Sequence, residues 1–341
     1  MGRITITDIA NKLKVAPSTV SRALNNHTSI SEKTKKNVIA LAEKLNYQPN
    51  IMAINLLRRK SNTIGVIVPQ ITSHFYSAII TSIQDVLYNT AFNLMVCISN
   101  ESFEEEVVLI QKLEKLQVDG VLVSTSSETK NFDHIKNLQK KGIPIVIFDR
   151  DCPGVRADKV LVDDYSGAFE AVNFLIQSGC KKIAHLGGPH NSSTSKHRLK
   201  GYLDALKKHK IPIKKEYIHH VSGFTSKSGI KTSKDLLNLK NPPDAIFAVN
   251  DNIAIAAMNV AKKMNIKIPE ELSIVGFNDD PHSSFMSPSL STVLQPVFSI
   301  GMLSARILLH HLKDVDAKIE FRHEVFKTEL ITRESSKLLN I

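Results

Sequence analysis

The chain of 341 residues has no tryptophan and only three cysteines, Cys97, Cys152 and Cys180. An odd number at this spacing excludes a disulfide framework and a cysteine metal site, so we expect buried thiols in a reducing compartment. Long apolar runs are also missing. No stretch approaches the roughly 20 residues that span a bilayer, and the first residues, MGRITITDIANKLKV, lack the apolar region of an export signal. We therefore expect a soluble, folded, cytoplasmic protein without a membrane partner.

Catalytic signatures are absent as well. The sequence contains no GxGxxG, GxxxxGK[ST], HExxH or GxSxG motif, and its thirteen histidines are scattered without metal spacing. We therefore expect a protein that is not an enzyme, with no catalytic residues, no metal and no cofactor.

Positive charge is abundant and concentrated near the N-terminus. The net charge is +11, and residues 1–60 carry eleven basic against three acidic residues, or +8. The other 281 residues carry 33 basic and 30 acidic residues, or +3. This distribution indicates a nucleic-acid-binding head on a nearly neutral body. Charge alone leaves open a merely solvated basic surface.

The first sixty residues show a helical pattern without strands. Thr5 and Asp8 form a capping-box signature, and Ile9, Ala10 and Leu13 recur at helical spacing. After a short break, Pro17 suits the first position of a second helix. Ser31 suits the cap of a third. Short helices with a tight break between the first two predict a helix-turn-helix module.

The pattern changes at Thr63 to apolar runs that alternate with helical stretches. These runs predict parallel β-strands covered by helices on both faces. There are too many for one comfortable sheet, so we expect two similar α/β lobes with a cleft between them. STVLQP and HEVFKTEL are expected to complete the lobes after the chain crosses between them. The runs are TIGVIVP, NLMVCIS, DGVLVS, PIVIFD, KVLVD, KKIAHLG, DAIFAVN and LSIVGF.

The second predicted helix has side chains suited to the major groove of DNA. Arg22 can bond guanine through two hydrogen bonds, and the hydroxyls of Ser18 and Ser21 are exposed near the helix start. Thr19 and Asn25 suit phosphate oxygens. An ordinary surface helix remains the alternative. With the caps, the predicted DNA-binding residues of the head are Thr5, Pro17, Ser18, Thr19, Ser21, Arg22 and Asn25.

Motifs along the whole chain resemble the lactose repressor/galactose repressor family of bacterial transcription regulators. The resemblance implies a helix-turn-helix head over residues 1–48, a hinge helix or linker over 49–61, and a periplasmic-binding-protein-like core over 62–341. Within the core, lobe 1 takes about residues 62–162 plus a late crossover segment, and lobe 2 about 163–290 plus the C-terminal segment. The motifs are TITDIANKLKVAPSTVSRALNN, SEKTKKNVIALAEKLNYQPN, NTIGVIVPQ, VDGVLVS, PIVIFDR, LGGPHNSSTSKHRLKGYLDAL, DAIFAVNDNIAIAAM, IPEELSIVGFNDDP and STVLQP.

The resemblance also gives the hinge a role. In the family this segment folds on operator DNA, and a leucine pair enters the minor groove and kinks the duplex. Asn50, Ala53 and Leu56 match the hinge residues, and Leu56 matches the wedge. Packing of Leu56 on the core is the alternative.

Residues that match the family's effector cleft are spread along the core. Aromatic rings, a carboxylate, a guanidinium and amides together suit a carbohydrate, and most follow predicted strands, at the edge where open α/β sheets bind ligands. Asp149 and Asn250 could instead cap helices, and Phe224 could be core. The matching residues are Phe75, Tyr76, Asp149, Thr194, Arg198, Phe224, Asn250 and Asn278.

Two positions depart from the family pattern. Lys14 stands where the family has glycine; a left-handed lysine there costs roughly 1 kcal/mol and suggests an altered turn. Asn278 replaces an aspartate, and an amide can donate as well as accept. The ligand contacts of sugar-binding relatives therefore do not transfer unchanged to this position.

The resemblance implies a sequence-specific regulator, usually a repressor, that binds a pseudo-palindromic operator as a homodimer under control of a sugar or sugar derivative. It would be cytoplasmic and nucleoid-associated. Alternatives are a regulator that responds to a nucleobase and a sequence-tolerant protein that bends DNA. An exported sugar-binding protein would fit the core, but it needs an export signal and no basic head.

Overall fold

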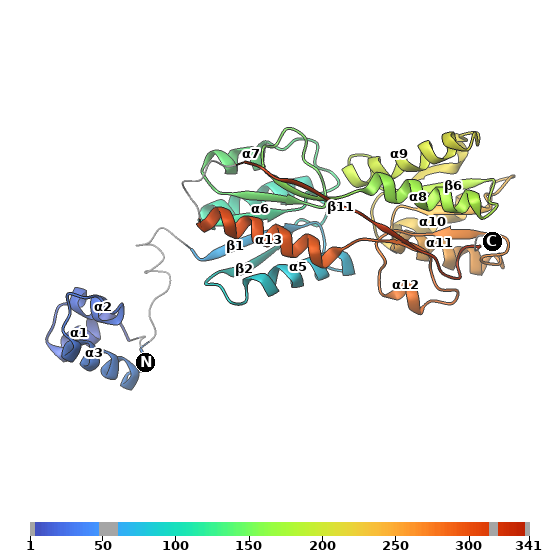
Figure 1. Ribbon diagram of the computed structural model, residues 1–341. Coiled ribbons are helices and arrows are strands. Elements are labelled where there is room, and N and C mark those ends of the chain that lie inside the picture. Colours follow the sequence, from blue (N-terminus) through green and yellow to red (C-terminus); the bar gives the residue numbers. More distant parts are fainter. Residues whose placement is uncertain (1–3, 48–60, 314–319, 338–341) are drawn as a thin grey trace. The chain divides into compact units, whose positions relative to one another are not determined.

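The computed structural model describes residues 4–47, 61–313 and 320–337. The chain divides into two compact units, Met1–Ser61 and Asn62–Ile341. We call the first unit the head and the second the core (Figure 1).

The head is a bundle of three short helices, which confirms the predicted helix-turn-helix module. They are α1 (Ile6–Leu13), α2 (Pro17–Leu24) and α3 (Glu32–Lys44). Each helix contributes two buried residues to one small apolar core, namely Ile9, Ala10, Val20, Ala23, Val38 and Ala42. Because this core is small, the caps matter for the stability of the head.

The caps of the head agree with the predicted signatures. Thr5 and Asp8 form a complete capping box, and the Ser31 hydroxyl accepts from the backbone N–H of Thr34. Lys14 ends α1 in the left-handed conformation, at φ 52° and ψ 44°, and its N–H bonds carbonyls of α1. Lysine therefore adopts the left-handed geometry that favours glycine, which is the condition under which strain was expected here, and an altered turn stays a prediction.

Lobe 1 is built on a parallel sheet with strand order β11-β5-β4-β3-β1-β2. Alternate strand residues pack against α5 (His74–Leu87) and α13 (Val297–Lys313) on one face and against α6 (Phe103–Lys115) and α7 (Asp133–Lys140) on the other. Burial on both faces explains the continuous apolar runs. The strands are β1 (Thr63–Val68), β2 (Asn93–Ile98), β3 (Gly120–Val123), β4 (Ile145–Phe148), β5 (Asp158–Val162) and β11 (His323–Phe326).

Lobe 2 repeats this plan on a smaller parallel sheet with strand order β7-β6-β8-β9. Figure 1 shows α8 and α9 on one side of β6 and α10 and α11 on the other. The strands are β6 (Ile183–Gly187), β7 (Ile218–His220), β8 (Ala245–Ala248) and β9 (Ser273–Val275). The helices are α8 (Asp164–Gln177), α9 (Ser193–Lys208), the 3-10 turn η1 (Lys215–Tyr217), α10 (Ser226–Leu237), α11 (Asp251–Lys263) and α12 (His282–Phe285).

The C-terminal part of the chain contributes to both lobes. The strand β10 (Thr292–Leu294) pairs with β12 (Glu329–Ile331) in an antiparallel ribbon beside α8, whereas α13 and β11 join lobe 1. The segment HEVFKTEL therefore supplies a strand to each lobe. The sequence did not predict β7, whose three residues include two histidines instead of an apolar run. In the part of the chain that the structure describes, no helix is long and apolar enough to cross a membrane.

Candidate functional site

Helix α2 of the head exposes Ser18 and Arg22, two of the side chains predicted to contact DNA. Val20 and Ala23 are buried in the head, and this fixes the helix so that Ser18 and Arg22 point to solvent. The Arg22 guanidinium forms no ion pair or hydrogen bond within the described residues. An exposed guanidinium on a fixed helix is available for a base edge.

The other predicted head residues are partly engaged in the local structure. Pro17 opens α2 and is exposed, while Thr19 and Ser21 are half-buried. The Thr5 hydroxyl belongs to the capping box, and the Asn25 amide donates to the Ser21 carbonyl over 2.9 Å. Their contacts with DNA stay predictions. The hinge residues Asn50, Ala53 and Leu56 lie outside the described residues.

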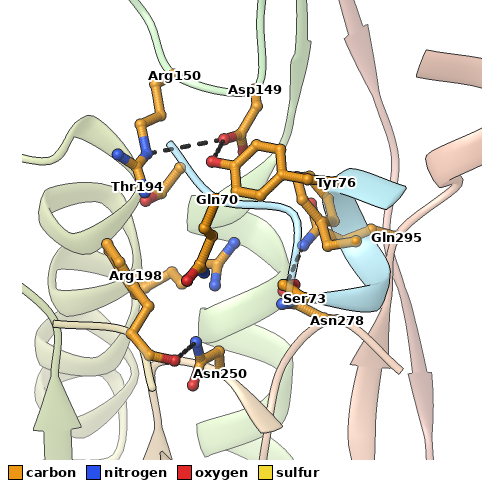
Figure 2. Close-up of a pocket in the computed structure, with 12 residues that line it drawn as sticks. Gln70, Ser73, Tyr76, Asp149, Arg150, Thr194, Arg198, Asn250, Asn278 and Gln295 are labelled. Atoms are coloured by element: carbon orange, nitrogen blue, oxygen red, sulfur yellow. Dashed lines mark hydrogen bonds and ion pairs between the residues drawn. The ribbon is translucent and has the colours of Figure 1, made fainter. Parts of the chain in front are cut away.

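All eight predicted effector residues line one cavity in the core (Figure 2). They come from both lobes and from segments more than 200 positions apart in the sequence. Four further residues line the same cavity, namely Gln70, Ser73, Arg150 and Gln295. The sequence carried a signal for three of these, since they lie in motifs that resemble the family: Gln70 ends NTIGVIVPQ, Arg150 follows Asp149 in PIVIFDR, and Gln295 lies in STVLQP. Nothing in the residue types alone separated them from their neighbours.

On the lobe 1 side, a buried network holds Asp149 at the end of β4. Its carboxylate accepts from the Tyr76 hydroxyl over 2.7 Å and from the Ser124 hydroxyl over 3.0 Å. Burial raises the pKa of Tyr76 well above its usual value, so this hydroxyl stays a donor. Asp149 has a φ of 64°, in the left-handed region that aspartate tolerates better than most residues. It caps no helix, so its position fits a ligand acceptor.

Arg150 continues this network and reaches toward lobe 2. Its guanidinium donates to both carboxylate oxygens of Glu101, over 2.7 and 2.8 Å, and to the Thr125 carbonyl. Its Cζ lies 4.9 Å from the centroid of the Phe224 ring, a cation–π contact between the lobes. Glu101 and Phe224 therefore hold Arg150 at the boundary of the cavity.

On the lobe 2 side, Arg198 is almost completely buried. Its guanidinium bonds the Asp164 carboxylate over 2.7 Å, donates to the Val249 carbonyl, and lies 3.7 Å over the Phe277 ring. Burial raises the pKa of Asp164, while Arg198 opposes this rise. Such a pair fixes the guanidinium in place before any ligand arrives.

Two amides complete the cavity. Asn250 caps α11 by accepting from the Ile253 N–H, and its Nδ2 donates to the Phe224 carbonyl over 2.9 Å. It is therefore both a cap and a cavity residue. The Asn278 Oδ1 accepts from the Gln295 amide over 2.6 Å (Figure 2). With its oxygen engaged, Asn278 offers N–H donors where an aspartate would offer only acceptors.

The remaining predicted residues also face this cavity. Thr194 lies in the first turn of α9, with its hydroxyl 2.8 Å from that of Ser192. The Phe75 and Tyr76 rings meet edge to face at 5.1 Å. Phe224 belongs to the apolar core of lobe 2 as well. The arrangement combines aromatic faces with fixed donors and acceptors, as sites for polar organic ligands do. Among the described residues, no group of histidine, cysteine and acidic side chains could hold a metal.

Comparison with known proteins agrees with both units. Residues 5–50 match the family described as bacterial regulatory proteins of the lacI family, and residues 172–336 match a periplasmic binding protein-like domain. The probable HTH-type transcriptional repressor ExuR of Bacillus subtilis (strain 168) is 37% identical over 341 residues, which cover 98% of this chain and 99% of that protein.

Two solved structures extend the comparison. The complex of the transcriptional regulator CelR with cellobiose matches with a TM-score of 0.73 and 27% identity, over 98% of this chain and all of that one. The lac repressor dimer bound to operator and the anti-inducer ONPF matches with a TM-score of 0.84 over 98% of this chain and 99% of that one. At 23% identity, the second match shows the fold alone.

Proposed function

Because the chain belongs to the lacI family of bacterial regulatory proteins, we propose that it is a transcriptional repressor that binds a pseudo-palindromic operator as a homodimer and responds to a sugar or sugar derivative. Its relatives are DNA-binding transcription regulators and not enzymes. The proposal covers the operator, the dimer, the effector and the cytoplasmic, nucleoid-associated location.

One observation carries the proposal: a DNA-binding head and a built polar cavity occur in one chain. The cavity brings eight predicted residues together from both lobes. Asp149 supplies an acceptor, Arg198 and Asn278 supply donors, and Phe75, Tyr76 and Phe224 supply ring surfaces. Sugars present hydroxyls around an apolar C–H face, which this mixture suits. The relative whose structure contains cellobiose supports the same ligand class.

Two heads are needed because a single head buries too little surface for tight, specific binding. A ligand that enters the cavity contacts both lobes, so it changes the relative free energies of their arrangements. We propose that the arrangement of the lobes then determines whether the two hinge segments of the dimer can fold on DNA. Ligand and operator must therefore change one another's affinity by the same factor.

The test is footprinting of the purified protein on DNA from its own upstream region, at physiological salt, with a panel of sugars and nucleobases. A protected palindrome that responds to one sugar is the expected result. A response to a nucleobase alone would reject the sugar. If a compound is shown to bind and leaves operator affinity unchanged at saturation, the proposed coupling is wrong.

The hinge assignment has its own experiment. Leu56→Ala should reduce the bend angle of the operator, because the leucine wedge is lost. A bend angle equal to that of the unmodified protein would reject the wedge.

A further inference from the structure

The core contains a strongly basic segment, although the total charge of the core is close to neutral. Residues 181–240 carry thirteen lysines and one arginine against three acidic residues, a net charge of +11. The rest of the chain outside residues 1–60 carries 19 basic and 27 acidic residues, or −8. A lysine-rich composition of the whole chain does not explain this contrast, because the surrounding core is acidic.

The fold places six of these lysines on or next to the elements that flank one edge of lobe 2. Strand β7 is the edge strand of the sheet. In the sequence, α9 precedes β7 and α10 follows it, and these two helices pack on opposite faces of the sheet. Figure 1 shows these two helices on opposite sides of β6. All thirteen lysines are exposed. We call six of them around β7 the lysine edge: Lys208, Lys210, Lys215, Lys227, Lys231 and Lys234.

The charge of the lysine edge is not neutralised by neighbouring acids. In residues 181–240, two lysines pair with carboxylates, Lys207 with Asp204 and Lys214 with Glu216. None of the six members of the lysine edge forms an ion pair with an acidic residue of the described chain. A cluster of unpaired cations raises the local positive potential and attracts anions.

The residue types that this edge lacks indicate which class of anionic partner it can bind. Within residues 181–240, every tyrosine and phenylalanine is buried, and the one arginine, Arg198, lies in the core cavity. This segment therefore offers no tyrosine, phenylalanine or arginine anchor for a protein interface. The neighbouring Phe169 ring of α8 is covered by Lys208, whose Nζ lies 5.2 Å from the ring centroid. The segment also lacks the ring surfaces that stack single-stranded bases and the guanidinium that reads guanine. Lysine point charges remain, and these suit the phosphates of a duplex.

We propose that the lysine edge of lobe 2 binds the phosphate backbone of double-stranded DNA without regard to sequence. The head and the edge belong to one chain, so DNA held by the head is at raised local concentration for a second, weaker contact. The edge adds a salt-dependent contribution to the affinity for any duplex and carries no sequence information. This contribution is distinct from operator reading by α2.

The experiment measures affinity for a random-sequence duplex against salt concentration, with the full chain. The variant Lys227→Gln/Lys231→Gln/Lys234→Gln removes three exposed charges of α10. The matched control, Lys112→Gln/Lys115→Gln/Lys140→Gln, removes three exposed charges of lobe 1 that form no ion pairs among the described residues. All proteins carry the same head, so a difference between the two variants originates in the core.

The α10 variant should bind random duplex about tenfold more weakly at low salt, and its salt slope should fall by about 2 to 3, since each phosphate contact contributes roughly 0.9. The control should keep the original slope. Lys227→Arg/Lys231→Arg/Lys234→Arg should restore binding, which separates lost charge from misfolding. Equal losses of affinity in the two glutamine variants would show that only the net charge of the protein matters. An unchanged salt slope in the α10 variant would show that these lysines do not contact DNA and are instead solvated or bind an acidic protein. Either result overturns the proposal.

Discussion

The head and the core cavity present the same residue type, arginine, in opposite states. The Arg22 guanidinium on α2 is exposed and has no partner among the described residues, whereas that of Arg198 is buried against Asp164, the Val249 carbonyl and the Phe277 ring. The first gains its interactions only from another molecule. The second already makes its interactions within the chain.

This difference separates two ways of building a binding site. An exposed side chain on a fixed helix costs the fold nothing, so its loss should affect binding alone. A buried ion pair shapes a cavity in advance, but loss of one partner leaves the other charge without compensation. Substitutions in the core cavity should therefore change both stability and ligand binding, and substitutions on α2 should change DNA binding alone.

The largest expected effect follows replacement of the buried guanidinium. Arg198→Met should lower the free energy of unfolding by about 3 to 5 kcal/mol, because Asp164 is then a buried, unpaired carboxylate. Urea denaturation of the full chain measures it. The double variant Arg198→Met/Asp164→Asn removes the uncompensated charge and should recover much of the loss. A loss below about 1 kcal/mol would show that the pair does not stabilise the core.

A smaller effect should appear with pH. His185 is fully buried between the Tyr202 and Phe247 rings, and burial lowers its pKa to about 3. The folded state disfavours the imidazolium, so stability is complete above the unfolded pKa of about 6.5 and is lost as pH falls toward 3. Between pH 6.5 and 5 the loss should reach about 2 kcal/mol.

The variant His185→Phe isolates this contribution. Its unfolding free energy should lack that part of the acid dependence, whereas the exposed control His323→Phe should retain it. Chemical denaturation at pH 7, 6 and 5 compares them. If both variants lose stability with acid as steeply as the unmodified protein, His185 is not the group that titrates.

A substitution on the exposed face of α2 should change DNA binding and leave the free energy of unfolding nearly unchanged. Arg22→Ala should weaken operator binding by about 1 to 3 kcal/mol and relax the preference at one base position. The unfolding free energy should change by less than about 0.5 kcal/mol, since the side chain is exposed. Binding to a series of operator variants measures the preference. An equal loss on every sequence would assign Arg22 to a phosphate.

The sequence predicted the structure of the head more completely than the contacts of the core cavity, and the reason is physical. The head depends on contacts between near neighbours in the chain, such as the bond from Thr5 to Asp8, so local patterns predicted its helices and caps. Continuous apolar runs likewise predicted most strands. The sequence did not predict which side chains bond the cavity residues, because these partners are distant in the chain and meet only after folding. Examples are Glu101 with Arg150 and Asn278 with Gln295. Strand β7 was missed because its edge position requires no apolar run.

The smallest expected effect tests whether the turn of the head is strained. Lys14 occupies a left-handed conformation at φ 52°, which costs a residue with a Cβ roughly 1 kcal/mol relative to glycine. Lys14→Gly should therefore stabilise the head by a little under this amount, because glycine also has more freedom to lose on folding. Thermal unfolding monitored through helix content measures it, with Lys14→Ala as a control that keeps the Cβ and removes the charge. If alanine stabilises as much as glycine, charge repulsion in the basic head is the cause, and the left-handed lysine is not strained.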